Sequence, residues 1–375
     1  MTRRESYLDW NATAPLRPEA VAAMTAALGA AGNPSSVHRW GRAARQRIEH
    51  AREAVAGLVG APAGGVIFVS GGTEANHLAL LGAGRPRLLV SAIEHRSVLD
   101  AVAGAELIPV DADGVVSLAA LEQLLAVDRR PALVSVMLAN NETGVIQPAA
   151  DIAALAHRHG ALFHCDAVQA AGKMALDAAA IGADLISLSA HKLGGPTGVG
   201  ALVATGAVAV EAQLRGGGQE GRRRAGTENV CGIVGFGAAA ATSGRELAAF
   251  DRVRALRDRL EAAIASIAPE AVVIGAGAPR LPNTSAIALP GVAAETQVIA
   301  LDLAGVMVSA GAACSSGKVQ PSHVLHAMGA GPELANSAIR VSLGWNSAST
   351  EVDHFLEAWA EFYRRARRRT TARAA

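Results

Sequence analysis

The sequence lacks an excess of charge of either sign. Its 34 lysines and arginines nearly balance 33 aspartates and glutamates, which leaves a net charge of +1. No global field therefore attracts nucleic acid or an anionic membrane, and we expect neither as a partner. Long apolar runs are also missing: the uncharged stretch 54–73 is broken by glycine and proline, and it predicts a buried strand and loop instead of a membrane span.

Cysteines and aromatic residues are scarce. Three widely spaced cysteines do not favour a disulfide framework or a zinc cluster, and the N-terminus has no apolar segment typical of a secretory signal. We therefore expect a cytoplasmic protein without a resident metal. Aromatic residues make up 3% of the chain although 51% is hydrophobic, so the core must consist of alanine, valine, leucine and isoleucine.

Short apolar runs alternate with helical stretches over the first two thirds of the chain. This alternation predicts an α/β fold in which helices cover both faces of a mostly parallel seven-stranded sheet. The expected strands are residues 66–70, 87–91, 106–110, 132–138, 161–166, 184–189 and 200–204.

The pattern changes after a long helical region at about 230–268. Strand-like runs at 271–275, 284–290 and 306–310 predict a smaller α+β domain, and the basic tail from Arg364 indicates a solvated helix end. We expect residues 13–250 to form the large domain. Residues 1–12 and 251–375 would then form the small one.

Polar residues recur where the predicted strands end. Two glycines and Thr73 stand between a strand and a helix, an arrangement that presents N–H groups to a phosphate but more often only caps a helix. His95 follows the next strand, and a lone histidine is more often structural than catalytic. Asn140 and Asn141 follow another, where paired asparagines usually form turns.

Asp166 and Lys192 are harder to explain as structural residues. Each comes where an apolar strand ends, and a half-buried charge there is costly unless it is paired or neutralised. Because α/β proteins build ligand sites at such strand ends, the set predicts a pocket for pyridoxal 5'-phosphate (PLP). Asp166 would pair with the pyridinium nitrogen and Lys192 would form the imine.

Motifs along nearly the whole chain strengthen this interpretation. In order they are "YLDWNATAPL", "GNPSSVHRWG", "SGGTEANHLAL", "EHRSVLD", "NNETGVIQP", "HCDAVQAAGK", "LSAHKLGGPTGVGAL", "GGGQEGRRRAGTEN", "SAGAACSSG", "PSHVLHAMG" and "SAIRVSLG". In order and spacing they resemble the cysteine desulfurases, fold-type I PLP enzymes of the class-V aminotransferase group. The resemblance implies removal of sulfur from L-cysteine, with L-alanine as the product.

The resemblance also implies a role for each matching residue. Lys192 binds the cofactor covalently, Asp166 pairs with its ring nitrogen, and Gln169 bonds to its phenolic oxygen. His95 stacks on the ring and moves protons. The cofactor phosphate is bound by Gly72, Thr73, Ser189 and His191. Thr227 of the neighbouring subunit also reaches this phosphate, which implies a homodimer with shared sites. Asn33, Asn141 and Arg340 bind the substrate carboxylate, for which the planar fork of arginine is well suited, and Asn141 is also expected to contact the cofactor.

Cys314 matches the catalytic cysteine, in a loop of small residues like the extended loop of the housekeeping and nitrogen-fixation type. Its thiolate would take the sulfur as a persulfide and pass it to an iron–sulfur scaffold or a sulfur-relay protein. It could also ligate a partner's cluster transiently. Cys165 and Cys231 indicate small core residues.

The sequence departs from the family pattern at two places, and three alternative functions are compatible with it. The family usually has arginine and then glycine where this chain has Gly221 and Arg222, and Ala225 replaces a common serine. A selenocysteine lyase, a small-substrate aminotransferase or a non-catalytic sulfur-relay scaffold would share the fold.

Overall fold

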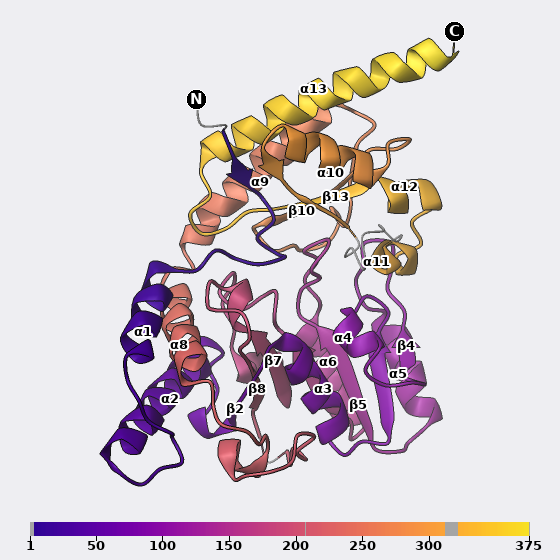
Figure 1. Ribbon diagram of the computed structural model, residues 1–375. Coiled ribbons are helices and arrows are strands. Elements are labelled where there is room, and N and C mark those ends of the chain that lie inside the picture. The colour runs from indigo at the N-terminus through magenta and orange to yellow at the C-terminus, as the bar shows by residue number, and fades with distance from the viewer. Residues whose placement is uncertain (1–3, 207, 312–321, 375) are drawn as a thin grey trace.

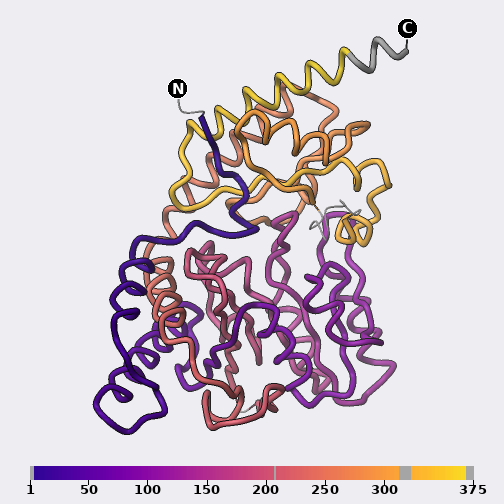
Figure 2. Tube along the Cα trace, in the orientation of Figure 1, coloured from indigo at the N-terminus to yellow at the C-terminus, as the bar shows by residue number. Residues whose placement is uncertain are grey.

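The structure is a computed structural model that describes residues 4–206, 208–311 and 322–374, with side chains described up to residue 368. Figure 1 shows a larger part built around a sheet and a smaller part above it, crossed by the long helix α13 (Ser349–Ala374). The N-terminal segment begins beside α13 and then descends to the larger part (Figure 2). The basic tail therefore continues this helix to Ala374.

A seven-stranded sheet forms the centre of the larger part, as predicted. Its spatial order is β2-β8-β7-β6-β5-β3-β4; β8 runs antiparallel to both of its neighbours, and the other pairs are parallel. All seven predicted strands are present: β2 (Val66–Val69), β3 (Arg87–Ser91), β4 (Glu106–Ile108), β5 (Ala132–Met137), β6 (Leu162–Asp166), β7 (Leu185–Ser189) and β8 (Gly200–Ala204).

Helices cover both faces of this sheet, and the alternation of side chains along the strands explains why. In β2, Val66 and Phe68 join the core beneath α2, α5, α6 and α8, whereas Ile67 and Val69 join the core beneath α3 and α4. Apolar residues at consecutive strand positions are therefore buried on opposite faces. The helices of this part are α1 (Pro18–Leu28), α2 (Arg39–Leu58), α3 (Gly72–Gly82), α4 (Arg96–Leu99), α5 (Leu118–Val127), α6 (Ala149–Arg158), α7 (Ala178–Ile181) and α8 (Val230–Arg245).

The smaller part has its own core and an antiparallel sheet of order β12-β13-β10-β9. Leu8 and apolar residues between Phe250 and Phe362 fill this core. The long helical region consists of two helices, because α8 ends at Arg245 and α9 begins at Ala249. The remaining elements are β1 (Ser6–Tyr7), α9 (Ala249–Ile267), β9 (Val272–Val273), β10 (Thr284–Ala288), α10 (Ala294–Leu303), β11 (Val306–Met307), β12 (Ser309–Ala310), α11 (His323–Ala327), α12 (Pro332–Ser337) and β13 (Ala338–Ser342).

No helix among the described residues is both long enough and apolar enough to span a membrane. The described part of the chain also contains no group of three or more histidine, cysteine or acidic side chains placed to hold a metal ion.

Candidate active site

A cavity of about 820 Å³ opens where β5, β6 and β7 end, between the larger and the smaller part. Its volume suits a small-molecule site, and the carboxyl ends of strands are where α/β folds bind ligands. Ten predicted site residues line it together: Gly72, Thr73, His95, Asn141, Asp166, Gln169, Ser189, His191, Lys192 and Arg340.

Lys192 lies in a short 3₁₀ turn, Ala190–Lys192, directly after β7. Its Nζ donates to the carbonyl oxygens of Asn11 at 2.7 Å and Ala12 at 2.8 Å. Burial and, to a smaller extent, the Arg340 charge lower the pKa of this amine to about 8, although Asp9 and Asp166 partly oppose the shift. The neutral, nucleophilic amine is therefore reached at a much lower pH than for an exposed lysine.

Asp166 ends β6 with its carboxylate buried beside the cavity. Its Oδ1 accepts a hydrogen bond from the Val168 N–H at 2.9 Å, and its Oδ2 accepts one from Asn76 Nδ2 at 2.8 Å. Burial raises the pKa of Asp166, while the Asn76 hydrogen bond and the charges of His95 and Lys192 lower it. Among the described residues, the hydrogen bonds to this carboxylate come from amides, so a bound cation would supply the partner that it lacks.

Asn76 is a site residue that the motif analysis did not single out. It lies one helical turn after Thr73 on α3, so the helix that follows the glycine turn also holds Asp166. Its Nδ2 donates to Ser97 Oγ as well, at 2.8 Å. The spacing of Thr73 and Asn76 was the available signal, because residues three apart share a helix face.

His95 caps α4 and lines the cavity at the same time. Its Nδ1 accepts from the Ser97 N–H at 3.1 Å and lies 2.8 Å from Ser97 Oγ. An Nδ1 that accepts a hydrogen bond from the backbone places the proton of the neutral ring on Nε2. Burial lowers the pKa of His95, with a further contribution from Lys192, so the neutral ring is the form available near pH 7.

The glycine turn presents the start of α3 to the cavity. Gly71 is the N-cap and provides no side-chain cap, so N–H groups of the first turn are available to an anion. A Cβ on Gly72 would lie 3.0 Å from Val168 Cγ2 and 3.4 Å from Ser189 Cβ, so a larger residue would crowd the site. Burial, with help from Lys192, lowers the pKa of His191 to about 4.

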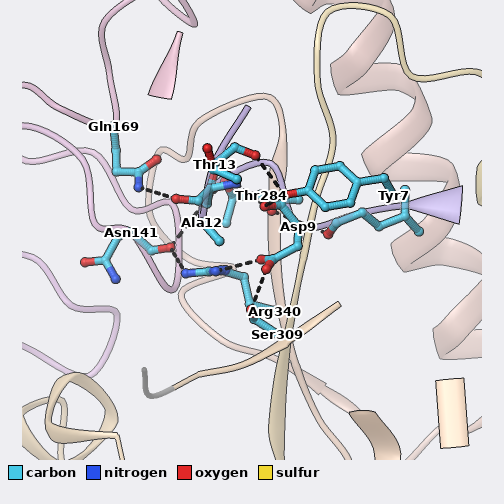
Figure 3. Close-up of polar contacts among 12 residues, drawn as sticks. Tyr7, Asp9, Ala12, Thr13, Asn141, Gln169, Thr284, Ser309 and Arg340 are labelled. Atoms are coloured by element: carbon cyan, nitrogen blue, oxygen red, sulfur yellow. Dashed lines mark hydrogen bonds and ion pairs between the residues drawn. The ribbon is translucent and has the colours of Figure 1, made fainter. Parts of the chain in front are cut away.

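Arg340 reaches the cavity from β13, in the smaller part. Its Nη1 donates to the Asn141 carbonyl at 3.1 Å, and its Nη2 donates to Asp9 Oδ1 at 2.8 Å (Figure 3). Its Nε is buried without a hydrogen-bond partner among the described residues. Asp9, which no motif argument assigned, therefore orients a guanidinium that retains a free donor for an anion.

Glu142 is a further carboxyl group of the cavity that the sequence analysis passed over. Its Oε2 accepts from Ser322 Oγ at 2.6 Å. Burial raises the pKa of Glu142 to about 7, although the Ser322 hydrogen bond and the charges of Arg340 and Arg96 oppose the shift.

Comparisons with known proteins agree with this geometry. The aminotransferase class-V family matches residues 6–355. A cysteine desulfurase of Cereibacter sphaeroides is 46% identical over 94% of both chains, and an IscS-like cysteine desulfurase of Mycobacterium tuberculosis is 41% identical over 98% of this chain and 99% of its own. This chain belongs to the cysteine desulfurases of the class-V aminotransferase family.

Solved structures of this family have the same fold. A NifS-like protein from Rickettsia africae superimposes with a TM-score of 0.90 at 34% identity, over 96% of this chain and 99% of its own. The expected fold class is thereby confirmed. Cysteine desulfurases use PLP as their cofactor.

The residues of the cavity fit PLP. Among the described residues, no cation hydrogen-bonds to the buried Asp166 carboxylate, no side chain caps the first turn of α3, and Lys192 carries an amine of lowered pKa. These three features suit, respectively, a protonated ring nitrogen, a phosphate and an aldehyde.

Two predicted site residues lie outside this cavity. Asn33 and Thr227 are exposed, and Thr227 borders a separate hollow of about 130 Å³ beside β2. Cys314 lies outside the described residues. Cys165 is fully buried in β6 and Cys231 is partly buried at the start of α8, so both occupy packing positions, as expected.

Proposed function

We propose that this protein is a PLP-dependent cysteine desulfurase that takes sulfur from L-cysteine onto Cys314 and releases L-alanine. The observation that carries the proposal is that one cavity holds the Lys192 amine, the Asp166 carboxylate and the Arg340 guanidinium. They supply, respectively, a nucleophile, a counter-ion for a ring nitrogen and a donor for a carboxylate.

PLP, when bound, supplies an electron sink that stabilises negative charge on the carbon next to the substrate amino group. Asp166 would hold its ring nitrogen, Gln169 its phenolic oxygen and His95 its ring face. Thr73, Ser189 and His191 would hold its phosphate together with the backbone at Gly72. Thr227 would reach the phosphate of the partner subunit in a homodimer, consistent with its exposed position outside its own cavity.

Arg340 and Asn141 bind the substrate carboxylate and thereby orient the rest of the molecule; Asn33 is assigned to the same carboxylate by the family resemblance. Lys192, with a pKa of about 8, can give up and take back a proton near neutral pH. The family resemblance also assigns proton transfer to His95. Its neutral ring carries a proton on Nε2, so accepting another proton would require Nδ1 to give up its hydrogen bond with the Ser97 N–H.

Cys314 completes the reaction as the sulfur acceptor. Its thiolate attacks the substrate sulfur, so one sulfur–sulfur bond forms and the carbon–sulfur bond breaks. The electron pair of the broken bond leaves with the carbon and takes up a proton, which yields L-alanine. The persulfide then passes to an acceptor, for which we propose an iron–sulfur scaffold or a sulfur-relay protein in the cytoplasm.

Product analysis tests this proposal. Purified protein loaded with PLP and given L-cysteine should produce L-alanine, and Lys192→Ala should lose at least about three orders of magnitude in rate because it removes the nucleophile. A keto acid as the main product would indicate an aminotransferase. Activity confined to selenocysteine would indicate a lyase, and no turnover with a visible PLP band would indicate a scaffold.

A further inference from the structure

Lys173 is a second buried lysine beside the cavity, and the proposed reaction does not use it. Its side chain is 6% exposed, and its Nζ donates to Gln169 Oε1 at 2.7 Å and Asn11 Oδ1 at 2.8 Å. Both acceptors are amide oxygens, so neither neutralises a charge. Burial, together with the charges of Lys192 and Arg340, lowers the pKa of Lys173 well below its ordinary value. Burying an amine without a charged partner costs free energy, so packing alone does not explain a lysine at this position.

The choice of lysine at this position is itself informative. The chain has only three lysines, at positions 173, 192 and 318, against 31 arginines. Position 173, whose side chain meets Gln169, therefore carries a lysine although arginine is the usual cationic residue of this chain. A guanidinium carries five N–H donors in a flat fork, which two amide oxygens cannot satisfy, whereas an amine directs its hydrogens from one atom.

Lys173 fixes the orientation of the Gln169 amide. Lys173 donates to the Oε1 end, and the Asn11 carbonyl accepts from the Nε2 end at 3.0 Å. Figure 3 shows the Gln169 side chain extended toward the chain segment that includes Ala12. Turning the amide over would direct its NH₂ at the Lys173 donor and its oxygen at a carbonyl oxygen. The held orientation leaves one Nε2–H for a ligand in the cavity that Gln169 lines.

The same amine also holds Asn11, whose carbonyl oxygen accepts from Lys192 Nζ at 2.7 Å. Gln169 and Lys192 therefore donate to one oxygen, on a residue that Lys173 anchors through its side chain. A continuous set of hydrogen bonds links Lys173 to both residues.

We propose that Lys173 is a positioning residue, which holds Gln169 so that an N–H group, and not a carbonyl oxygen, faces the phenolic oxygen of PLP. This inference rests on the proposed function, since it takes PLP as the occupant of the cavity. Lys173 touches neither PLP nor substrate; it acts through Gln169.

The visible absorption band of the PLP-loaded protein, titrated with pH, tests the proposal without measuring turnover. A hydrogen bond to the phenolic oxygen of PLP disperses the negative charge of that oxygen. Without this hydrogen bond, the neighbouring imine proton is held more strongly. Lys173→Met should therefore raise the apparent pKa of the band by about 0.5–1 unit, the effect expected of one hydrogen bond. Lys173→Gln keeps an N–H donor without the amine and should stay near wild type. The other titratable and charged groups around Lys192 are unchanged in every variant: His95, His191, Asp9, Asp166 and Arg340.

A double-mutant cycle decides whether Lys173 acts through Gln169. Gln169→Leu should raise the band pKa, and adding Lys173→Met to it should change nothing more. Additive shifts would overturn the inference, since they would mean that Lys173 acts by its own charge. Thermal unfolding of each cofactor-free variant verifies that it is folded. If Lys173→Met does not fold, a Lys173→Gln shift as large as that of Gln169→Leu would overturn the inference. A wild-type protein with no visible band in PLP would overturn the proposed function as well.

Discussion

Lys192 is an amine held by two carbonyl oxygens, and no carboxylate among the described residues accepts a hydrogen bond from it. This environment does not stabilise the charged form strongly enough to offset burial. The pKa consequently falls to about 8 from the ordinary 10.5. An amine must be neutral to attack an aldehyde, so in the proposed function the shift would prepare Lys192 to capture PLP near physiological pH.

We therefore predict how PLP uptake by the cofactor-free protein depends on pH. Because the amine is neutral above its pKa, the rate of covalent uptake should rise with pH through a midpoint of about 8 and then level off. Stopped-flow absorbance measures this rate. Arg340→Met removes a charge that lowers the pKa, so its midpoint should move upward. A wild-type midpoint near 10.5, or an uptake rate independent of pH, would contradict this account of Lys192.

Some site residues could be predicted from sequence because their chemistry is costly at a strand end. Asp166 and Lys192 are ionisable groups that follow buried apolar runs, so they needed a ligand to explain them. Asp9 and Asn76 gave no such signal: Asp9 meets Arg340 across 331 positions, and Asn76 meets Asp166 across 90. Their roles depend on which parts of the fold come together.

The loop that carries Thr227 is held at two points on the larger part. Glu220 is buried and accepts from Arg52 Nη1 and Nη2 at 2.8 and 2.9 Å, and also from the Phe68 N–H at 3.0 Å. Arg224 donates to Glu74 Oε1, on the first turn of α3, at 2.9 Å. These contacts fix the loop beside β2 and α3, so Thr227 projects from a rigid support.

The departure at positions 221 and 222 has a conformational consequence. Glu220, Gly221 and Arg222 have φ values of 46°, 62° and 65°, all in the left-handed region that favours glycine. The family's usual order would place glycine at position 222. This chain instead places arginine there, and Arg222 is exposed.

We predict that Arg222→Gly stabilises the protein by about 0.5–1 kcal/mol, because relief of left-handed strain exceeds the entropic cost of glycine. The thermal unfolding midpoint at fixed protein concentration measures the change. Arg222→Ala is the matched control: it removes the same charge but keeps a Cβ, so it should gain nothing. An equal gain in both variants would show that charge, and not backbone strain, was responsible.

The whole molecule combines the core of the larger part, which lies on both faces of its sheet, with a separate core built from Leu8 and residues from Phe250 to Phe362. We propose that these cores are the two domains expected with a boundary near residue 250. Asn11 connects them: it bonds to Thr284 and Ser342 in the smaller part, and to Gln169 in the larger. Apolar alternation predicted the seven strands of the larger sheet and β9 and β10 of the smaller one, because strand patterning is local, but it did not predict β13, which lies between β10 and β12. It could not predict that an N-terminal segment lies between the two sheets, because those contacts are far apart in sequence.

Formation of a persulfide on Cys314 is the step that defines the proposed desulfurase activity, and mass spectrometry of the protein after one turnover measures it. PLP-loaded wild type, mixed with L-cysteine without reductant, should carry one extra sulfur on the peptide containing Cys314 and release an equal amount of L-alanine. Cys165→Ala and Cys231→Ala should do the same, apart from losses of packing.

Cys314→Ser should still bind PLP and L-cysteine, since Lys192, Asp166 and Arg340 are intact, but it should form no persulfide on any peptide. A serine hydroxyl is too weakly acidic to attack sulfur and cannot hold it in transferable form. If Cys314→Ser produced L-alanine at the wild-type rate, Cys314 would not be the sulfur acceptor, and a lyase that expels sulfide directly would replace the desulfurase.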